Sequence, residues 1–436
     1  MTFPLNRMQL VLMTILVIGS AAFSQEHFVT SSARELPVSK VVDVLVVGVN
    51  EGGIAAAWKA GQAGRSVLVL SGHYFLSDVV AAQARYWLEA DEVPQGAFSR
   101  ALFGTAGTEG GIRAIPLTPW QYKTKLEDLL RDAGVAYHYN TRPVAALHDA
   151  GGDIAGVVVS NKAGIQAICA KVVIDATPTG AVARMMGAQT TPWRVEQVDV
   201  SRVAYKNNVS GSVKRGDFYE YSLTVPMTDG SWPERNKAEV LLRDKHNTAN
   251  WKETNKAYAQ EMHMIEPVSI ITESTLTGTS WPSPGDVDLD VFRPRNIPYL
   301  YVLSQSAGVP RDLAKKLTRP VHLADVGERI GDAGGREAAQ RTAPQRPTVV
   351  TPEPGRRQGT THRDAGADWR QLWPWSRRLL ARLSRRIQPG EVVVSTGAQG
   401  GRGHLVEYAG LRRPRHGQPG YGRNCCHACG AGGRAG

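Results

Sequence analysis

The residues best suited to chemistry lie in one glycine-rich turn, Val47-Gly48-Val49-Asn50-Glu51-Gly52-Gly53. Its glycines match the first and last positions of the pattern G-x-G-x-x-G. The first glycine of that pattern makes a tight turn, and the last lets a helix pack closely on a strand. The middle position holds Asn50, which tolerates left-handed backbone angles and has an amide that can donate to a phosphate. Gly48, Asn50 and Gly53 therefore predict a site for the pyrophosphate of a dinucleotide. The alternative is a strand–helix turn that binds no ligand.

A second position with chemical meaning follows the next apolar run, Arg65 to Leu70. In dinucleotide-binding domains an acid at this place binds the ribose hydroxyls. Here Ser71 and Gly72 follow the run, and no acid is present. A serine hydroxyl can bond to a ribose, but more weakly than a carboxylate does. We therefore expect Ser71 to contact the ribose and the affinity for the nucleotide to be reduced.

A strand, a turn, a helix and a second strand must hold these residues in place. Val41 to Val47 is apolar except for Asp43, which is typical of a parallel strand buried on both faces. The alanine-rich segment Ile54 to Ala63 predicts a helix that ends at Gly64. With Arg65 to Leu70 as the next strand, the pattern indicates a βαβ unit.

The elements expected after this unit continue the same domain. They are a helix over Thr118 to Ala133, a strand over Val135 to Tyr139, three short strands over Val144 to His148, Ile154 to Ser160 and Ile165 to Cys169, and a return strand over Val172 to Asp175. Turn sequences rich in glycine and asparagine separate the three short strands, which favours antiparallel hairpins.

This order of elements resembles the glutathione-reductase-like flavoproteins, and specifically the FAD-dependent oxidoreductase family. The matching residues are Ala133-Gly134-Val135, Asp153 to Ser160, Asn161-Lys162, Gly164 and Ala170 to Thr177. A second match, over Ile297 to Gly331, resembles the closing segment of the family, with Arg319-Pro320 and Gly327…Gly331 as the corresponding residues.

The resemblance implies FAD as the cofactor and assigns further contacts to it. Val144 or its neighbour would present backbone to the adenine. The segment from Thr177 to Gly180 would lie near the pyrophosphate. Arg319 and Pro320 would precede a helix aimed at the flavin, whose positive end stabilises the negative charge of the reduced ring.

The expected fold class is α/β, with a Rossmann-like FAD/NAD(P)-binding domain and an antiparallel β excursion. A second, mixed α+β substrate domain and a disordered tail complete the fold. The expected divisions are a signal peptide over 1–24, the FAD-binding domain over 41–188, the substrate domain over 189–296, a return segment over 297–331 and the tail over 332–436. In the substrate domain we expect a strand from Asp217 and an interrupted helix over Lys237 to Met264.

The amino terminus has the pattern of a secretory signal. Arg7 precedes the apolar stretch Met8 to Ile18, and Ala22 and Ser24 fit the positions before a cleavage site. That stretch is too short to span a bilayer comfortably, so no stable membrane span is expected after cleavage. We expect a secreted or periplasmic protein; the alternative is an uncleaved anchor helix.

The positive charge of the chain is confined to its tail. Of the formal net charge of +11, residues 333–436 contribute +12, from eighteen arginines, no lysine and six acids. The remainder is close to neutral, so no specific nucleic-acid partner is expected. The tail is either a disordered basic segment or the product of a shifted reading frame near Asp332. Its cluster Cys425-Cys426-His427-Ala428-Cys429 lacks a second ligand pair, and no metal site is predicted.

These patterns predict an FAD-dependent oxidoreductase in which FAD takes a hydride from a small or carbohydrate-like substrate. The alternative is a non-catalytic, truncated or frameshifted relative that binds the cofactor weakly or not at all. No catalytic residue is predicted. The side chains whose chemistry would suit a place near a flavin are His263, His322, Arg311 and Arg319.

Overall fold

A computed structural model of the chain describes residues 35–350, except 105–110, 193–196, 207–216, 229–231, 250–255, 265–267 and 279. The predicted signal peptide, the cysteine cluster and the tail after residue 350 therefore lie outside the described residues.

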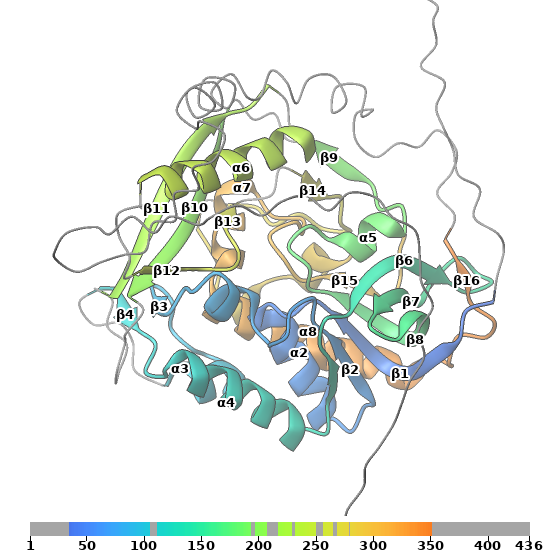
Figure 1. Cartoon of the computed structure of the whole chain (residues 1–436). Helices are drawn as coiled ribbons and strands as arrows, with labels where there is room; N and C mark the ends of the chain where they lie inside the picture. The colour runs from blue at the N-terminus through green and yellow to red at the C-terminus, as the bar shows by residue number, and fades with distance from the viewer. Residues whose placement is uncertain are drawn as a thin grey trace, which may run out of the picture. The chain divides into compact units, whose positions relative to one another are not determined.

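The central sheet has the strand order β16-β6-β7-β8-β1-β2-β5, and β15 also pairs with β8 (Figure 1). Strand β1 (Val38–Val47) lies between β8 (Gly164–Asp175) and β2 (Val67–Leu70), parallel to both. Strands β5 (Ala136–His138) and β15 (Leu300–Val302) are also parallel to their partners. Residues 44–47 of β1 are at most 1% exposed, as expected for a valine-rich strand covered on both faces. The prediction of an internal parallel strand is confirmed.

The antiparallel excursion is formed by β6 (Arg142–His148), β7 (Ile154–Asn161) and the first half of β8. The structure differs from the prediction of separate strands before and after Ala170, because β8 continues without a break from the hairpin into the parallel sheet. Lys171 stays in the strand and forms an ion pair with Asp43 of β1 at 2.9 Å. One strand therefore joins the two parts of the sheet.

Three helices cover one face of the sheet: α2 (Glu51–Gln62), α4 (Pro119–Asp132) and α8 (Pro320–Gln340). Helices α2 and α8 pack side by side (Figure 1). A Cβ atom at Gly327 would lie 2.2 Å from the carbonyl oxygen of Gly52, and one at Gly331 would lie 2.2 Å from that of Ala56. The two glycines therefore allow the helices to approach more closely than any larger residue permits.

The predicted end of the fold at Gly331 is wrong. Helix α8 runs on to Gln340, and Ala338 is fully buried. Arg341 then forms an ion pair with Asp149 at 2.7 Å and donates to the carbonyl oxygens of Ile154 and Lys171. Strand β16 (Thr348–Val349) pairs with β6. The arginine-rich composition suggested an unstructured segment, but the first arginine beyond the helix ties it to the sheet.

The opposite face of the sheet carries α5 (Ala181–Met185) and a second core that contains Leu45, Val47 and Val302. The buried carboxylate of Asp175, at the end of β8, accepts hydrogen bonds from the backbone N–H groups of Val182 and Ala183 at 2.7 and 3.0 Å. This caps the first turn of α5 and fixes the loop that leads to it.

A second sheet consists of β10 (Gln197–Lys206), β11 (Phe218–Pro226), β12 (Lys256–Tyr258) and β13 (His263–Met264). Helix α6 (Trp232–Ala249) packs on one face of it. The helix predicted over Lys237 to Met264 is therefore wrong beyond Ala249, because pairing with β10 holds residues 256–258 and 263–264 in strands. A two-stranded ribbon pairs β9 (Thr190–Pro192), which precedes β10 in the chain, with β14 (Val268–Ile270), which follows β13.

The segment between β2 and α4 contains elements that were not predicted. They are the π-helix η1 (Asp78–Ala82), β3 (Trp87–Leu88), α3 (Ala97–Phe103) and β4 (Arg113–Ala114). Four short turns of helix, η3 (Pro284–Asp286), η4 (Leu289–Phe292), α7 (Arg311–Ala314) and η5 (Lys316–Thr318), precede α8. The aromatic ring of Phe218 in β11 packs against Tyr86 and Trp87, so the second sheet contacts this segment directly.

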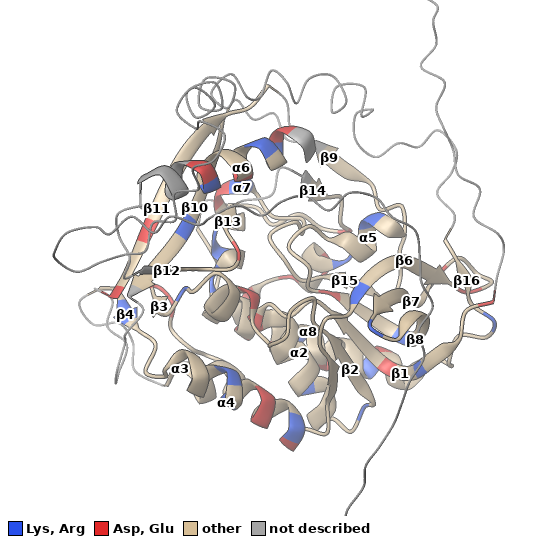
Figure 2. Cartoon of the chain, in the orientation of Figure 1, with Lys and Arg blue, Asp and Glu red and all other residues tan. Residues whose placement is uncertain are grey.

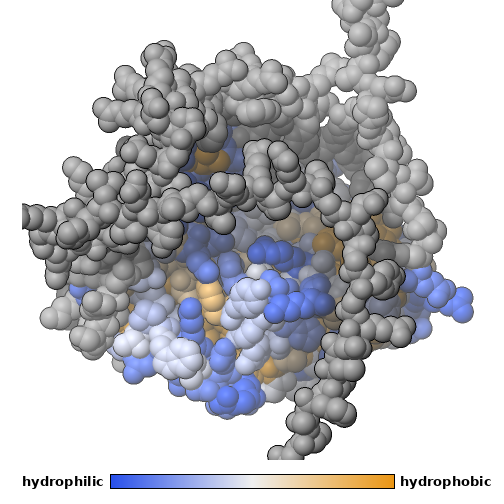
Figure 3. All heavy atoms as spheres, in the orientation of Figure 1, coloured by the Kyte–Doolittle hydropathy of each residue, from blue (hydrophilic) through white to orange (hydrophobic). Residues whose placement is uncertain are grey.

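Charged residues are prominent on α4, α6, β10 and β11 (Figure 2). Hydrophilic residues also form most of the visible part of the face in Figure 3, with hydrophobic residues between them. No helix in the described part of the chain has the length and apolar character needed to cross a membrane.

Candidate cofactor site

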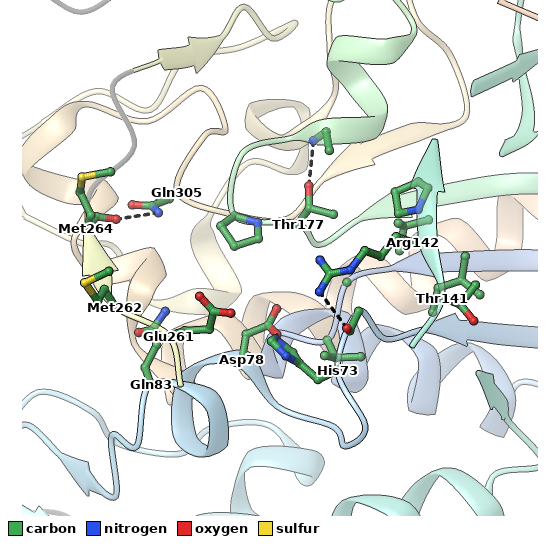
Figure 4. A pocket seen from close by; sticks show the side chains of 18 of the residues that line it. His73, Asp78, Gln83, Thr141, Arg142, Thr177, Glu261, Met262, Met264 and Gln305 are labelled. Atoms are coloured by element: carbon green, nitrogen blue, oxygen red, sulfur yellow. Dashed lines mark hydrogen bonds and ion pairs between the residues drawn. The ribbon is translucent and has the colours of Figure 1, made fainter. Parts of the chain in front are cut away.

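A cavity of about 380 Å³ lies at the carboxyl ends of β1, β2 and β8. Ligands of open α/β sheets bind at this edge, where neighbouring strands connect in opposite directions. Its walls also include residues next to or within β13, so the cavity borders the second sheet (Figure 4). The lining residues that matter below are Val47, Gly48, Val49, Gly72, His73, Asp78, Gln83, Arg142, Pro143, Thr177, Pro178, Arg235, Glu261, Met262, Met264 and Gln305.

The glycine-rich turn faces this cavity with its backbone. Val47 and Val49 both line it, yet each is only 1% exposed, because their side chains point into the two cores. Gly48 between them has φ of +100°, and a Cβ atom there would lie 2.6 Å from the backbone of Ala176. Only glycine fits this position. Backbone amides beside the N-terminus of α2 are suitable donors to an anion.

Asn50 holds the turn together and does not point its amide at a ligand. Its Oδ1 accepts from the backbone N–H of Gly53 at 2.8 Å, and so caps α2. Its Nδ2 donates to the carbonyl oxygens of Ala176 and Leu303, both at 2.8 Å. The predicted hydrogen bond from this amide to a phosphate is therefore replaced by contacts within the protein. Gly53 is buried behind the turn, where a Cβ atom would lie 2.5 Å from that of Ala176.

Ser71 is fully buried and turns away from the cavity. Its hydroxyl donates to the carbonyl oxygen of Phe75 at 2.8 Å and accepts from the N–H of His73 at 3.1 Å. The cavity wall after β2 is formed by the next two residues, Gly72 and His73. Arg142 closes this corner by donating to the carbonyl oxygen of Gly72 at 3.1 Å. Ser71 therefore shapes the loop, and its neighbours Gly72 and His73 line the cavity.

An ion pair lies beside the turn. His73 Nε2 and Asp78 Oδ1 are 3.3 Å apart, and the hydrogen bond between them raises the pKa of His73 (Figure 4). The N–H of Asp78 donates to the carbonyl oxygen of Val49 at 2.9 Å, which places this acid next to the glycine-rich turn. When His73 is protonated, its positive charge balances Asp78 beside the backbone amides of the turn.

Glu51, the first residue of α2, is completely buried behind this wall. Burial raises its pKa from 4.5 to about 7. The carboxyl accepts hydrogen bonds from Ser77 Oγ at 2.5 Å, the Val80 N–H at 3.0 Å and the Tyr122 hydroxyl at 3.3 Å. Glu51 thereby fixes the start of η1, the element that places Asp78 and Gln83 in the cavity wall.

Of the remaining predicted contacts, Thr177 lines the cavity, whereas Val144 and Gly180 do not. Thr177 lines the cavity, and its hydroxyl donates to Asp175 at 2.6 Å while accepting from the Ala181 N–H at 2.7 Å. Val144 is 49% exposed and does not line it, whereas its neighbours Arg142 and Pro143 do. Gly180 lies behind the wall.

Gly180 precedes α5 as its N-cap with φ of +58°, and a Cβ atom there would lie 2.3 Å from the Ile270 side chain. Arg319 pairs with Asp91 and lines a different cavity. Pro320 is buried as the first residue of α8. The structure therefore brings Gly48 and Thr177 together at the cavity, with Asn50, Gly53 and Ser71 directly behind it.

Sequence reasoning missed several lining residues: His73, Asp78, Gln83, Arg142, Arg235 and Glu261. His73 follows the strand end by three positions, which was a usable signal. The others come from segments without a motif. Within the described residues, no group of three or more His, Cys, Asp and Glu side chains could hold a metal ion.

The fold and this cavity define a dinucleotide-binding α/β protein. A model of the FAD dependent oxidoreductase family matches residues 43–305, more than half of the chain. The chain belongs to this family, and FAD is its cofactor.

Three solved structures are similar to this chain at sequence identities of 12–16%. A geranylgeranyl bacteriochlorophyll reductase-like protein from Thermoplasma acidophilum is 15% identical, with 69% of this chain and 79% of that chain covered and a TM-score of 0.43. A myxobacterial chondrochloren halogenase is 12% identical, with 70% and 77% covered and a TM-score of 0.41. A flavoprotein/dehydrogenase from Cytophaga hutchinsonii is 16% identical, with 70% and 80% covered and a TM-score of 0.40. No curated protein matches the chain.

The residues present fit FAD. The backbone at Gly48 and Val49 lines the cavity beside the N-terminus of α2, which is where a pyrophosphate binds in domains of this kind. Gly72, Arg142 and Pro143 would hold the adenosine end, because they line the cavity where β2 ends and β6 begins. Met262, Met264 and Gln305 line the part of the wall that belongs to the second sheet and the loop after β15.

Proposed function

We propose that the protein uses FAD to oxidise a small, carbohydrate-like substrate. When bound, FAD supplies a two-electron acceptor that can take a hydride from a C–H bond. The observation that supports this proposal is the composition of the cavity wall, which combines the glycine-rich turn of the nucleotide-binding sheet with Met264 of the second sheet. A cofactor held at the turn would therefore extend toward a sheet that is available for substrate binding.

The protein's own residues would prepare that reaction by position and by exclusion of water. Glu51 and Asn50 fix the turn from behind, so the cofactor meets a preformed backbone surface. Met262 and Met264 provide apolar wall on the side of the second sheet. The Gln305 amide donates to the carbonyl oxygen of Met264 at 3.0 Å and joins this wall to the loop after β15.

The test is anaerobic reduction of the FAD-loaded protein by candidate substrates. Neutral monosaccharides and small alcohols are each added to the yellow protein, and the visible flavin absorbance is followed. Bleaching by a sugar or alcohol, with recovery on admission of an electron acceptor, is expected. A protein that takes up no FAD would instead favour the non-catalytic relative. Uptake of FAD without bleaching by any of these compounds would reject the proposed substrate class.

We also propose that the protein is exported, on the basis of the sequence pattern over Met1 to Ser24. N-terminal sequencing of protein recovered from outside the cytoplasm is expected to begin at Gln25. Retention of Met1 in the recovered protein would overturn this assignment.

A further inference from the structure

A second cavity, of about 280 Å³, lies between the second sheet and the segment around β3. Gln83, which follows η1, lines both this cavity and the cofactor cavity. The two spaces therefore meet at one side chain. The other lining residues are Arg85, Trp87, Glu89, Asp199, Ser201, Val203, Glu220, Ser222, His263, Lys315, Thr318 and Arg319.

The two faces of the second sheet differ in character. Val198 and Val200 of β10 pack with Leu242 of α6 in a small core. The alternate residues Asp199, Ser201 and Val203 face the cavity, because side chains alternate between the faces of a strand. On β11 the cavity side holds Glu220 and Ser222, with Ser222 opposite Ser201. The sheet therefore presents hydroxyl and carboxylate groups to the cavity from two adjacent strands.

The charged groups in this wall are largely neutralised within the protein. Arg85 forms ion pairs with Glu89 at 3.2 Å and with Glu92 at 3.0 Å. Arg319 is paired with Asp91. A ligand therefore need not supply a counter-ion for either arginine.

The acids on the sheet side are held by hydroxyl groups. Glu220 accepts from Ser201 Oγ at 2.7 Å, and Asp199 accepts from Thr224 Oγ1 at 2.7 Å. Lys315 is the remaining cation among the described lining residues, against these two acids. Across the whole lining the cations Arg85, Lys315 and Arg319 balance the acids Glu89, Asp199 and Glu220. A neutral ligand therefore needs no counter-ion here, and its hydroxyl groups could donate to the free lone pairs of Asp199 and Glu220.

His263 adds a neutral donor and acceptor to the wall. Burial, with a contribution from Arg85, lowers its pKa to about 4, so the imidazole is uncharged near neutral pH. Trp87 and Val203 contribute apolar atoms to the same wall, although both residues are largely buried. This combination suits a molecule with many hydroxyl groups and an apolar C–H face.

We infer that this second cavity is the substrate site and that it binds an uncharged, polyhydroxylated compound of monosaccharide size, which Glu220 selects through hydrogen bonds. The inference rests on the proposed function and deepens it, because the substrate would lie across Gln83 from the cofactor cavity. Glu220 acts here as a specificity-determining residue.

The test is isothermal titration calorimetry of the FAD-loaded full chain with D-glucose, D-galactose, myo-inositol and sorbitol. Sodium gluconate and alanine serve as the anionic and zwitterionic comparisons. We expect at least one neutral polyol to bind with a millimolar Kd, and both comparisons to bind at least tenfold more weakly. Binding of gluconate or alanine more tightly than every neutral polyol would overturn the inference, and so would the absence of polyol binding.

The matched variants are Glu220→Gln and Asp128→Asn. Glu220→Gln removes a carboxylate from the cavity wall and should weaken polyol binding at least tenfold. Asp128→Asn makes the same chemical change at an exposed pair with Arg131 on α4 and should leave binding unchanged. The visible spectrum of bound FAD reports folding and cofactor uptake in both variants. Loss of FAD from the unmodified chain would contradict the proposed function, whereas retained FAD with equal polyol binding in both variants would contradict only the inference about this site.

Discussion

The cofactor cavity and the second cavity are built in different ways. At the glycine-rich turn the cofactor cavity presents backbone, because the side chains of Val47 and Val49 are buried in the two cores. The second cavity is formed by side chains such as Ser201, Ser222 and Glu220, which project from a sheet whose other face is packed against α6. In the cofactor cavity, the backbone atoms that would contact the ligand also form the fold. In the second cavity, the ligand surface can change while the fold stays intact.

This difference implies that stability and substrate specificity depend on different regions of the molecule. Substitutions near the turn should affect folding and cofactor binding together. Substitutions on the exposed side of β10 and β11 should affect binding alone. The predictions below test that separation, from the largest expected effect to the smallest.

Gly48→Ala should produce the largest effect. The added Cβ atom would lie 2.6 Å from the Ala176 backbone, at a φ of +100° that alanine rarely adopts. We expect the free energy of unfolding to fall by on the order of 2–4 kcal/mol and FAD affinity to fall at least tenfold. Urea denaturation and FAD titration measure the two. Gly64→Ala is the control, with φ of +73° and no atom within 4 Å of its Cβ, and it should leave FAD affinity unchanged. Equal FAD affinity in the two variants would disprove the close-packed turn.

Arg341→Ala tests the correction to the end of the fold. The side chain forms an ion pair with Asp149 and donates to two backbone carbonyl groups, and it is largely buried. Its loss removes the hydrogen bonds that these acceptors receive from the guanidinium group, so we expect destabilisation by about 2–3 kcal/mol in a thermal or urea unfolding experiment. Arg336→Ala is the matched control, because Arg336 is exposed on α8 and pairs there with Asp332. Unchanged stability of Arg341→Ala would show that residues beyond Gly331 do not support the sheet.

Glu51→Gln should change the pH dependence of stability. Burial raises the pKa of Glu51 from 4.5 to about 7, so the folded protein keeps this proton at pH values where the unfolded chain releases it. The resulting stabilisation is fully present below pH 4.5 and is lost as the pH rises to about 7, by up to roughly 3 kcal/mol. In the glutamine variant, the slope of the free energy of unfolding against pH should lack this contribution. Urea denaturation at a series of pH values between 4.5 and 7.5 measures it, and identical slopes for the two proteins would refute the buried protonated acid.

Ser222→Ala should have the smallest effect on stability. Ser222 is exposed on β11 and lines the second cavity without supporting a core. We expect the free energy of unfolding to change by less than about 0.5 kcal/mol. A larger loss in urea denaturation would show that this side of the sheet also supports the fold, and the contrast between the cavities would then fail.

Features that depend on neighbouring residues could be predicted from the sequence, whereas features that depend on residues far apart in the chain could not. The turn around Gly48 and its flanking strand and helix are local, and periodicity with glycine spacing identified them. Ser71 was placed at the correct strand end, but its orientation depends on bonds to Phe75 and His73 in a loop with no repeating pattern. The role of Asn50 was also hidden, because its partners Ala176 and Leu303 lie 126 and 253 positions away.

The second cavity and the end of the fold escaped prediction for related reasons. The cavity's walls come from five separate parts of the chain, around Arg85, Ser201, Glu220, His263 and Arg319. Of these parts, only the one around Arg319 lies in a segment that the sequence matched to the family. The end of the fold was judged from composition, which cannot distinguish a solvated arginine from one like Arg341 that bonds to the sheet. Composition describes an average, whereas a buried ion pair depends on one residue.

Strand β15 and helix α8 come late in the chain, and this position affects the order in which the fold can form during synthesis. Strand β15 completes the sheet beside β8, and α8 covers α2, although these partners are separated by more than a hundred residues along the chain. Gln305, part of the cofactor cavity wall, also emerges late. A nascent chain that has reached only the second sheet exposes the apolar side of α2 and has an incomplete nucleotide cavity. We therefore expect FAD to be captured only after α8 has been synthesised, and an arrested chain that ends before α8 to be a target for chaperones and proteases.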